Sequence, residues 1–396
     1  MLAPSRAPAS VERPPPRRLY VDPPPPHPRR RLRRILAIAG LICLIPALVS
    51  WGEAMTNPSN SSIFIRTVEW LRDTGARGVV NTVESWYYSL TAPAKGGPGL
   101  HALPQQSGAV AGQGFGTFRV VHYYKPPNLK PLIHPALSGE GVWHPTFAPG
   151  GSRPPVLITS FRPDPDYPQL VAGVGWIDHT RTSTSLYPGL TEPSVSLPNR
   201  GPEEVPTSLR SKLVATFNSG FKSSDTNSGG FVYQGHTYAP LQNGFATIVR
   251  YRSGKVDIVS WSHGSDAPSD VVWARQNLPL IVNHGKPNPN LSDGPEWGST
   301  LGNAIRVWRS GVGIDRRGNL IYSAANDMTV GSLANVLLRA GAVRAMELDI
   351  NAEWTSFITY RLPGAGHPAN LLESMEPPVS RYLSPDDRDF FAVYVK

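Results

Sequence analysis

The sequence predicts an α+β fold with a mixed, mostly antiparallel sheet and few helices, preceded by one N-terminal transmembrane helix. The sheet is predicted because short β-branched or aromatic runs, separated by turn residues, follow one another from Thr117 onward. The transmembrane helix is predicted because an uncharged run of 18 residues, 35–52, directly follows a cluster of arginines. Internal repeats are absent from the sequence, so a repeat architecture is not expected.

The positive charge of the chain is concentrated at its N-terminus. The formal net charge is +9, and residues 1–34 alone hold nine arginines, two acids and ten prolines. The remaining residues carry 29 bases and 27 acids. A segment of this composition cannot bury enough apolar surface to offset the entropy lost on ordering. We therefore expect residues 1–34 to be a disordered cytoplasmic tail. Nucleic-acid binding is not expected, since it requires a basic patch on a folded surface.

Residues 35–52 are predicted to anchor the protein as a single span of the cell membrane. As a helix they would cover about 27 Å, close to the thickness of the hydrocarbon core. The preceding arginines predict a cytoplasmic N-terminus and an extracytoplasmic C-terminal domain. A cleaved signal peptide, with a weak site at residues 52–54, and a buried soluble helix are the alternatives. The only cysteine, Cys43, lies in this run, which excludes a disulfide framework and a cysteine-based zinc site.

Residues 53–116 are predicted to form an amphipathic stalk and a linker. Within residues 61–90, apolar side chains recur largely every three to four residues, which favours two short helices broken near Gly75 and Gly78. Residues 91–116 are rich in Gly, Pro and Ala, which is typical of a linker.

We expect residues 117–204 to be the strand-rich N-terminal part of the exported domain, followed by a domain formed by residues 205–396. Turns at residues 252–254 and 315–319 predict two hairpins. A helix is predicted over residues 329–341, with Thr329 as its cap and Gly341 as its end. The expected strands are 117–124, 155–161, 169–177, 212–218, 245–251, 255–261, 278–286, 304–315, 319–324 and 342–350.

Two carboxylates on the last of these strands are the first candidate for chemistry. Glu347 and Asp349 are two residues apart, so a strand would place them on one face, together with Asn351. Mutual repulsion and partial burial can separate the pKa values of such a pair, which suits one to act as acid and the other as base or nucleophile. An exposed polar face of an edge strand is the alternative.

Two further clusters could bind a ligand. The strand 212–218 ends in Asn218-Ser219-Gly220, where an amide and backbone N–H groups could contact anions or sugar hydroxyls, although a simple turn gives the same pattern. Arg306 and Arg309 face opposite ways on a strand, so at most one of them contacts a site. An arginine beside glycine suits phosphate or carboxylate binding, and a surface arginine is the alternative. The histidines form no metal-binding pattern, so neither a metal nor a cofactor is predicted.

Five segments, in this order, resemble the phosphodiester glycosidase family, which includes the uncovering enzyme that removes N-acetylglucosamine from a phosphodiester. The resemblance covers residues 205–396. Family members have a strand ending Asn-Gly-Gly-Phe-Phe and, later, a strand ending Asn-Leu-Asp-Gly-Gly-Gly-Ser. The corresponding segments here are Asn218-Ser219-Gly220-Phe221-Lys222, 278–286, 309–320, 333–338 and Glu347-Leu348-Asp349-Ile350-Asn351-Ala352-Glu353.

The resemblance carries over residue by residue, with departures. Asn218, Gly220, Arg309 and Asp349 stand at matching positions, whereas Glu347 replaces an Asn and Glu353 replaces a Ser. The three glycines become residues 350–352, which are larger, so we expect a reshaped pocket.

Together with the predicted anchor, the resemblance implies a membrane-anchored, extracytoplasmic hydrolase of a sugar-1-phosphodiester linkage in an envelope glycan or glycolipid. The alternative is a catalytically inactive envelope protein that binds a glycan or a protein partner on the same scaffold. A third option is a structural stalk protein whose function lies in residues 61–90. For the hydrolase, the expected catalytic residues are Asp349 with Glu347 or Glu353, and the expected substrate-binding residues are Asn218, Gly220, Arg309 and Asn351.

Overall fold

The chain forms two units, Met1–Ala54 and Met55–Lys396. Most of the predicted tail and the predicted strand at 117–123 lie outside the residues that the structure describes. The computed structural model describes residues 28–57, 59–109, 124–146, 153–198, 200–223, 229–298, 300, 304–361 and 365–396.

Helix α1 (Pro28–Thr56) contains the predicted span, residues 35–52, and passes through Pro46 without ending. Its segment Arg31–Thr56 is long and apolar enough to cross a membrane, a property that signal sequences share. Leu36 and Leu48 are more than half exposed, which does not fit the alternative of a helix buried in a soluble core.

The predicted pair of short helices is confirmed as α2 (Ile63–Leu71) and α3 (Arg77–Thr91). Ser62 caps α2 by accepting a hydrogen bond from the backbone N–H of Ile65. A short π-helical segment, η1 (Arg72–Ala76), joins the two, and Gly75 with φ 94° breaks the helical path there. We call α2, η1 and α3 together the helical segment.

The strands form three sheets, and every pairing among the described residues is antiparallel. The largest sheet contains, in spatial order, β1 (His144–Pro145), β2 (Val156–Phe161), β3 (Ala172–Ile177), β14 (Leu320–Met328), β13 (Val307–Asp315), β15 (Ala342–Glu347), β11 (Val282–Asn283) and β12 (Lys286–Pro287). The second contains β7 (His236–Ala239), β6 (Phe231–Tyr233), β10 (Val271–Gln276), β8 (Ala246–Tyr251) and β9 (Val256–Ser260). The third contains β17 (Gly366–Asn370), β16 (Phe357–Arg361), β5 (Leu213–Asn218), β18 (Phe390–Val395) and β4 (Thr182–Tyr187).

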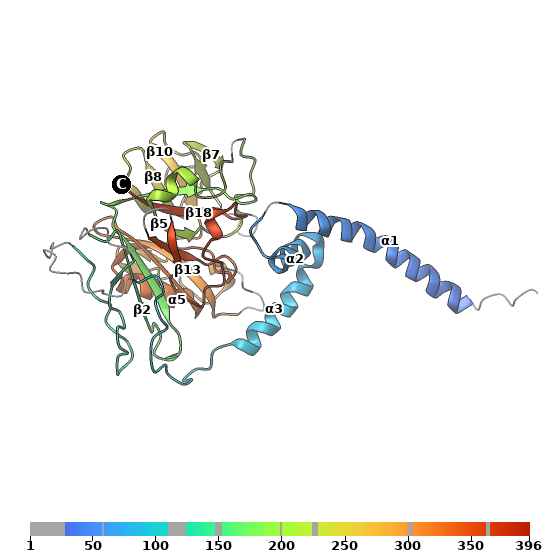
Figure 1. The fold of residues 1–396 in the computed structure, drawn as a ribbon, viewed down its shortest axis with the longest axis horizontal. Helices are drawn as coiled ribbons and strands as arrows, with labels where there is room; N and C mark the ends of the chain where they lie inside the picture. Colours follow the sequence, from blue (N-terminus) through green and yellow to red (C-terminus); the bar gives the residue numbers. More distant parts are fainter. Residues whose placement is uncertain are drawn as a thin grey trace, which may run out of the picture. The chain divides into compact units, whose positions relative to one another are not determined.

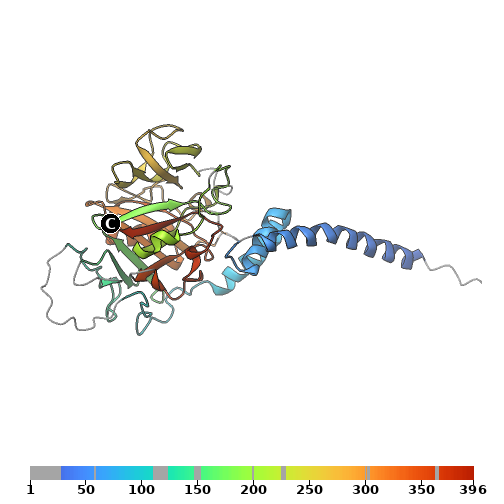
Figure 2. The same ribbon diagram turned by 45° about the horizontal axis from the view of Figure 1, so that its top comes forward.

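The predicted fold class, mostly antiparallel sheet with few helices, is therefore confirmed. Figure 1 shows β5 and β18 between the sheet of β8 and β10 above and the sheet of β13 below, and Figure 2 keeps this order after the turn. Both predicted hairpins are present, as β8–β9 and β13–β14. Short 3-10 turns complete the described elements: η3 (Thr207–Lys212), η4 (Pro295–Trp297) and η6 (Arg381–Leu383).

The predicted helix at 329–341 is α5 (Val330–Arg339), which packs on the largest sheet. Thr329 caps it by accepting a hydrogen bond from the backbone N–H of Ser332, and Gly341 follows it with φ 103°. Leu333 and Leu337 are buried against β13 at Gly311, where a Cβ would lie only 3.1–3.2 Å from their side chains.

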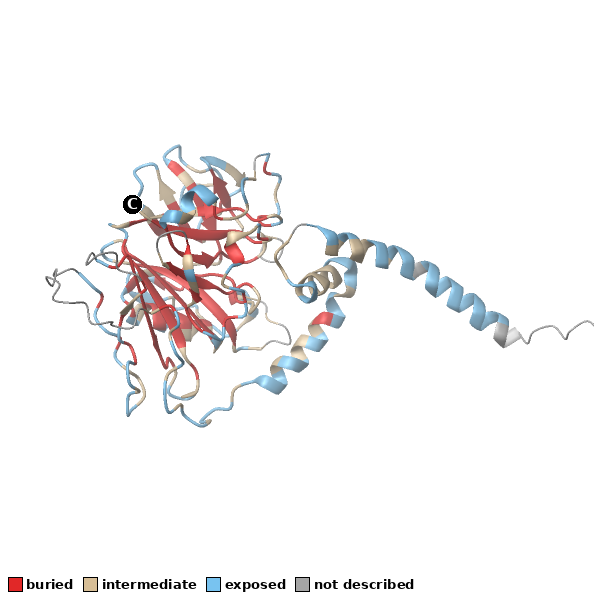
Figure 3. Ribbon diagram, viewed as in Figure 1, coloured by how far each residue is buried: buried red, intermediate tan, exposed pale blue. Residues whose placement is uncertain are grey.

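The main core lies between the three sheets. Its centre is a cluster of rings in which Phe217 of β5 contacts Tyr322, Phe357 and Phe391 at centroid distances of 5.0–6.2 Å. This cluster joins β5 and β18 to β14, and Figure 3 shows these strands as buried. The ends of β5 and β15 are thus fixed close to each other, because each strand is fastened to this core.

Candidate active site

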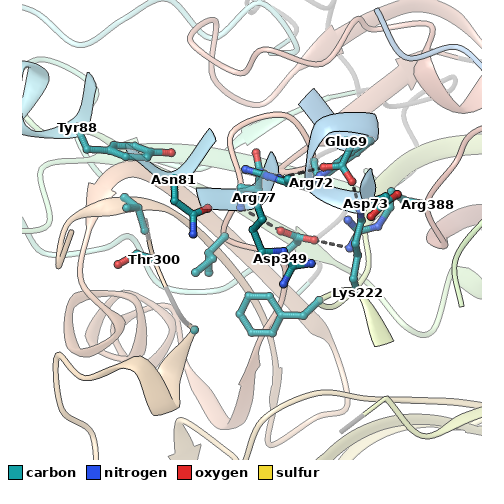
Figure 4. Close-up of a pocket in the computed structure, with 16 residues that line it drawn as sticks. Glu69, Arg72, Asp73, Arg77, Asn81, Tyr88, Lys222, Thr300, Asp349 and Arg388 are labelled. Carbon is teal, nitrogen blue, oxygen red and sulfur yellow. Dashed lines mark hydrogen bonds and ion pairs between the residues drawn. The ribbon is translucent and has the colours of Figure 1, made fainter. Parts of the chain in front are cut away.

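A cavity of about 340 Å³ lies where the loops after β5 and β15 meet the helical segment. Figure 4 shows its labelled side chains, with Arg77, Lys222 and Arg388 around Asp349. The loops after β5 and β15 contribute Phe221, Lys222, Asp349, Ile350, Asn351 and Trp354, and the helical segment contributes Glu69, Arg72, Asp73, Arg77, Asn81 and Tyr88.

Asp349 is the carboxylate that the sheet places in this cavity. The predicted strand 342–350 ends earlier, because β15 stops at Glu347. Asp349 therefore lies beyond the strand, and not on one strand face with Glu347 as predicted. The chain leaves the sheet because the backbone N–H of Asp349 donates to the carbonyl of Ser219, after β5, at 3.1 Å. Asp349 therefore bridges two sheets and is only 4 % exposed.

Arg388 and the backbone of Asn351 hold the Asp349 carboxylate. Its Oδ2 accepts a hydrogen bond from Arg388 Nη2 at 2.6 Å, and its Oδ1 accepts from the backbone N–H of Asn351 at 3.0 Å. The same Arg388 nitrogen donates to the carbonyl of Gly220 at 3.1 Å, and this guanidinium also lies 5.0 Å from the Trp354 ring. Arg388 thus fixes the carboxylate and the loop after β5 with one charged group.

Asn218 connects the first two predicted clusters. Its amide nitrogen donates to the Ser310 hydroxyl at 3.0 Å, and that hydroxyl donates to the carbonyl of Asp349 at 2.7 Å. Its amide oxygen accepts from the hydroxyl of Tyr322 and from the backbone N–H of Ser356. With the second amide proton on the carbonyl of Ser219, all its hydrogen-bonding capacity is used inside the protein. Asn218 is therefore placed to position Asp349, and it does not line the cavity.

Arg309 and Glu347 form a buried pair on the other face of β13. Arg309 Nη1 lies 2.6 Å from Glu347 Oε1, and Arg309 also donates to the carbonyls of Met328 and Trp297. Neither residue lines the cavity, because neighbouring residues on a strand point to opposite faces and Ser310 takes the Asn218 side. Arg309 therefore has internal partners where the resemblance implied a phosphate contact.

The surroundings of Glu347 favour its neutral form. Burial raises the pKa of Glu347 to about 7, although the Arg309 guanidinium lowers it, and the charge of Asp349 adds a smaller rise. The carboxyl is fully buried, and its Oε2 has no hydrogen-bond partner among the described residues. Burial thus raises the pKa of one member of the predicted carboxylate pair, Glu347.

The remaining predicted residues lie in the turn after Asp349 and after β5. Asn351 lines the cavity, and its side chain accepts the backbone N–H of Glu353 at 2.9 Å. Glu353 is half-buried, its pKa is raised by burial, and it is not among the lining residues. Gly220 provides its carbonyl to Arg388 and packs closely on Asn277, 3.3 Å from the position of a Cβ.

Several charged residues of the cavity were not predicted from the sequence. Lys222 ends the Asn218–Lys222 segment and forms an ion pair with Glu69 of α2. Arg72 pairs with Glu69 and Glu84. The sequence signal that could have indicated Arg388 is the charged run Asp-Asp-Arg-Asp at 386–389. A charged run directly before a strand suggests pairing inside the protein.

Charged side chains of both signs line the cavity. Four cationic side chains, Arg72, Arg77, Lys222 and Arg388, lie there with the carboxylates Glu69, Asp73 and Asp349. Glu84, which is outside the lining, also pairs with Arg72. Over the described residues, no group of three or more His, Cys, Asp or Glu is arranged to hold a metal ion.

Comparison with solved structures gives low similarity over much of the chain. The zebrafish N-acetylglucosamine-1-phosphodiester alpha-N-acetylglucosaminidase catalytic domain, auto-inhibited by its pro-peptide, is 15 % identical, with a TM-score of 0.40, and covers 62 % of this chain and 84 % of its own. A hypothetical protein from Synechocystis is 14 % identical, with a TM-score of 0.35 and coverage of 62 % and 63 %. A putative exported protein from Burkholderia pseudomallei is 12 % identical, with a TM-score of 0.33 and coverage of 59 % and 75 %.

Comparison with curated proteins finds no match. The sequence model of the family described as phosphodiester glycosidase matches residues 211–349. This match runs from the start of β5 to Asp349 and includes Asn218, Gly220 and Arg309. The resemblance predicted from the motifs is thus confirmed: over residues 211–349 the chain is similar to the phosphodiester glycosidases.

Proposed function

We propose that this protein is a membrane-anchored, extracytoplasmic hydrolase of a sugar-1-phosphodiester linkage in an envelope glycan or glycolipid. One observation carries the proposal: the Asp349 carboxylate, at the end of the segment that is similar to phosphodiester glycosidases, lies in a cavity that four cationic side chains also line. The apolar run 35–52 of helix α1, which arginines of the same helix precede, supports the anchor and its orientation.

In the proposed reaction, the bond between C1 of the sugar and the phosphate oxygen breaks, and its electron pair stays on that oxygen. The leaving phosphomonoester has a second pKa of about 6, so it needs no proton from the protein. One carboxylate therefore suffices, and we assign Asp349 to the C1 side, as general base toward water or as nucleophile. The water oxygen ends on C1 as a hydroxyl that keeps one proton, and the other proton passes to the Asp349 carboxylate and then to solvent.

Cations of the cavity are assigned to the phosphate. Arg388 and Lys222 lie on the same side as Asp349 and can balance the phosphoryl charge as it develops. Asn351 is the predicted substrate-binding residue that lines the cavity. Asn218, Gly220 and Ser310 are assigned to positioning, because each holds the Asp349 loop or the loop after β5.

The test is Asp349→Asn, which keeps the shape of the side chain and removes its charge. We expect turnover of a sugar-1-phosphodiester, measured as released sugar, to fall by about 10²–10⁴-fold, as for loss of a general base or nucleophile. The matched control is Glu353→Gln, in the same turn but outside the lining, which should keep turnover near that of the parent. Unchanged turnover in Asp349→Asn contradicts the proposal.

A catalytically inactive, glycan-binding protein remains the second candidate because of Ile350. Its side chain packs with Phe221 and Val307 at the cavity, where the family has glycine. Its Cδ1 would lie 2.6 Å from a Cβ placed on Gly298, so the site is tightly filled there. Binding of a sugar-1-phosphodiester to the parent protein without release of sugar would favour this candidate.

A further inference from the structure

Helix α3 has an exposed apolar stripe that has no partner among the described residues. Val79, Val83, Trp86 and Leu90 are 63–77 % exposed, and Figure 3 shows most of α3 as exposed or intermediate. Their spacing of four, three and four residues places them along one side of the helix. Tyr87, 62 % exposed, widens this stripe. A soluble protein seldom leaves so many large apolar side chains together in water.

The opposite side of α3 forms a wall of the cavity. Arg77, Asn81 and Tyr88 line the cavity, and Glu84 between them pairs with Arg72. At about 100° per residue, this polar stripe lies roughly 150° around the helix from the apolar stripe. The orientation of α3 is therefore set by the cavity, and the apolar stripe necessarily faces away from the domain.

The chain keeps the helical segment close to the end of α1. Only six residues separate Thr56 from Ile63, so the two lie within about 25 Å even when that chain is fully extended. Ile63 and Phe64, at the start of α2, are also exposed apolar residues, at 65 % and 71 %. If α1 spans a membrane, the helical segment lies within reach of the bilayer surface.

Residues 59–61, between α1 and α2, are fastened to the domain by polar contacts. Ser59 and Ser61 donate to Asp387 at 2.5 and 2.9 Å, and Asn60 donates to Asp386. The start of α2 is thereby fixed beside the loop that holds Arg388. Because this loop is part of the cavity region, the cavity also lies close to the membrane end of the domain.

From these observations we infer that the helical segment is a membrane-interface element, with the apolar stripe of α3 seated in the lipid headgroup and upper acyl region. The inference rests on the proposed anchoring by α1. A lipid surface is the favoured occupant because Phe64, Trp86 and Tyr87 are the aromatic types that concentrate at the membrane interface. The cavity behind α3 then lies about one helix diameter from the headgroups.

The test uses the full chain in lipid vesicles, with Cys43 replaced by serine and single cysteines labelled with an environment-sensitive fluorophore. The label is placed at Val83 in the apolar stripe, at Gly40 in α1, and at Ser253 in the exposed turn between β8 and β9. A fourth label at Asn81, on the cavity side of α3, is the matched control on the same helix. Each variant is measured in vesicles with and without brominated phospholipid, which quenches fluorophores in contact with acyl chains.

We expect brominated lipid to quench the labels at Gly40 and Val83, and to leave those at Asn81 and Ser253 unchanged. Quenching at Gly40 without quenching at Val83 overturns the inference while the anchoring stands. Blue-shifted emission at Val83 without quenching also overturns it, because a protein surface or a second copy then covers the stripe. Absence of quenching at both Gly40 and Val83 contradicts the anchoring and the inference together.

Discussion

At the scale of single residues, several charged side chains of the domain are paired in its interior. Arg309–Glu347, Arg388–Asp349, Arg275–Asp389 and Arg381–Asp386 are buried pairs with nitrogen–oxygen distances of 2.6–2.8 Å. Removing one member of such a pair leaves an uncompensated charge and costs about 3–5 kcal/mol. The carboxylates that attract attention in the sequence are therefore held rigidly, which suits groups that must be oriented for a reaction.

Glu347 should make stability depend on pH. Its pKa is raised to about 7, so between about pH 4.5 and 7 the folded state keeps a proton that the unfolded state loses. Stability should fall over this range as pH rises, by about 3 kcal/mol in total. Denaturation curves measured at several pH values test this, and Glu347→Gln should abolish the slope even if its overall stability is lower. The control is Glu373→Gln at an exposed position, which should keep the pH dependence of stability. If the pH dependence persists in Glu347→Gln, or disappears in Glu373→Gln, then Glu347 is not its cause.

The sequence predicts some residues of the site and not others for a physical reason. Asp349 is predicted because its neighbours match a motif and alternate with apolar residues. Arg388 is 39 residues further on, and only the pairing of β18 with β5 brings it to Gly220 and Asp349. The internal role of Arg309 was not predictable either, since the position of Glu347 on the neighbouring strand decides it.

At the scale of elements, long periodic segments are predicted best. The apolar spacing predicts that α5 exists, and Thr329 and Gly341 predict its two ends. The strands β2, β5, β8 and β13 are clear in the sequence as runs of β-branched or aromatic residues. Strand β17, with the sequence Gly-His-Pro-Ala-Asn, has no such pattern and forms because β16 offers it an edge. The sequence predicts that α2 and α3 are helices. Their place at the cavity was not predictable, because it depends on tertiary contacts such as Lys222–Glu69.

Helix α5 should contribute strongly to stability through one residue. Leu333 is fully buried against β13, so Leu333→Ala should lower the free energy of unfolding by about 2–5 kcal/mol, through lost contacts and a cavity. Chemical denaturation monitored by circular dichroism gives this value. Leu338→Ala, a half-buried leucine of the same helix, is the matched control and should cost clearly less. Equal losses in both variants would contradict the packing described here.

At the scale of the whole molecule, the two parts predicted as 117–204 and 205–396 share their sheets. Strand β3 pairs with β14, and β4 pairs with β18. Which strands pair could not be predicted from the sequence, because these pairings join residues more than a hundred positions apart. The described residues from Met55 onward accordingly form one unit.

The anchor should be separable from this unit. A chain that begins at Met55 is expected to remain in the soluble fraction after cell lysis, whereas the full chain should sediment with membranes and resist extraction by high salt. Mass spectrometry of the membrane-bound form should give the full mass, since a cleaved signal peptide would remove residues 1–54. Recovery of the full chain in the soluble fraction would contradict the anchor.

The position of β18 has a consequence for when the site can assemble. This strand lies between β5 and β4, although about 170 residues separate it from β5 along the chain. During synthesis, β5 and Asp349 emerge from the ribosome before Arg388 and β18 do. Until β18 has emerged, β5 has an open edge and Asp349 lacks its Arg388 partner.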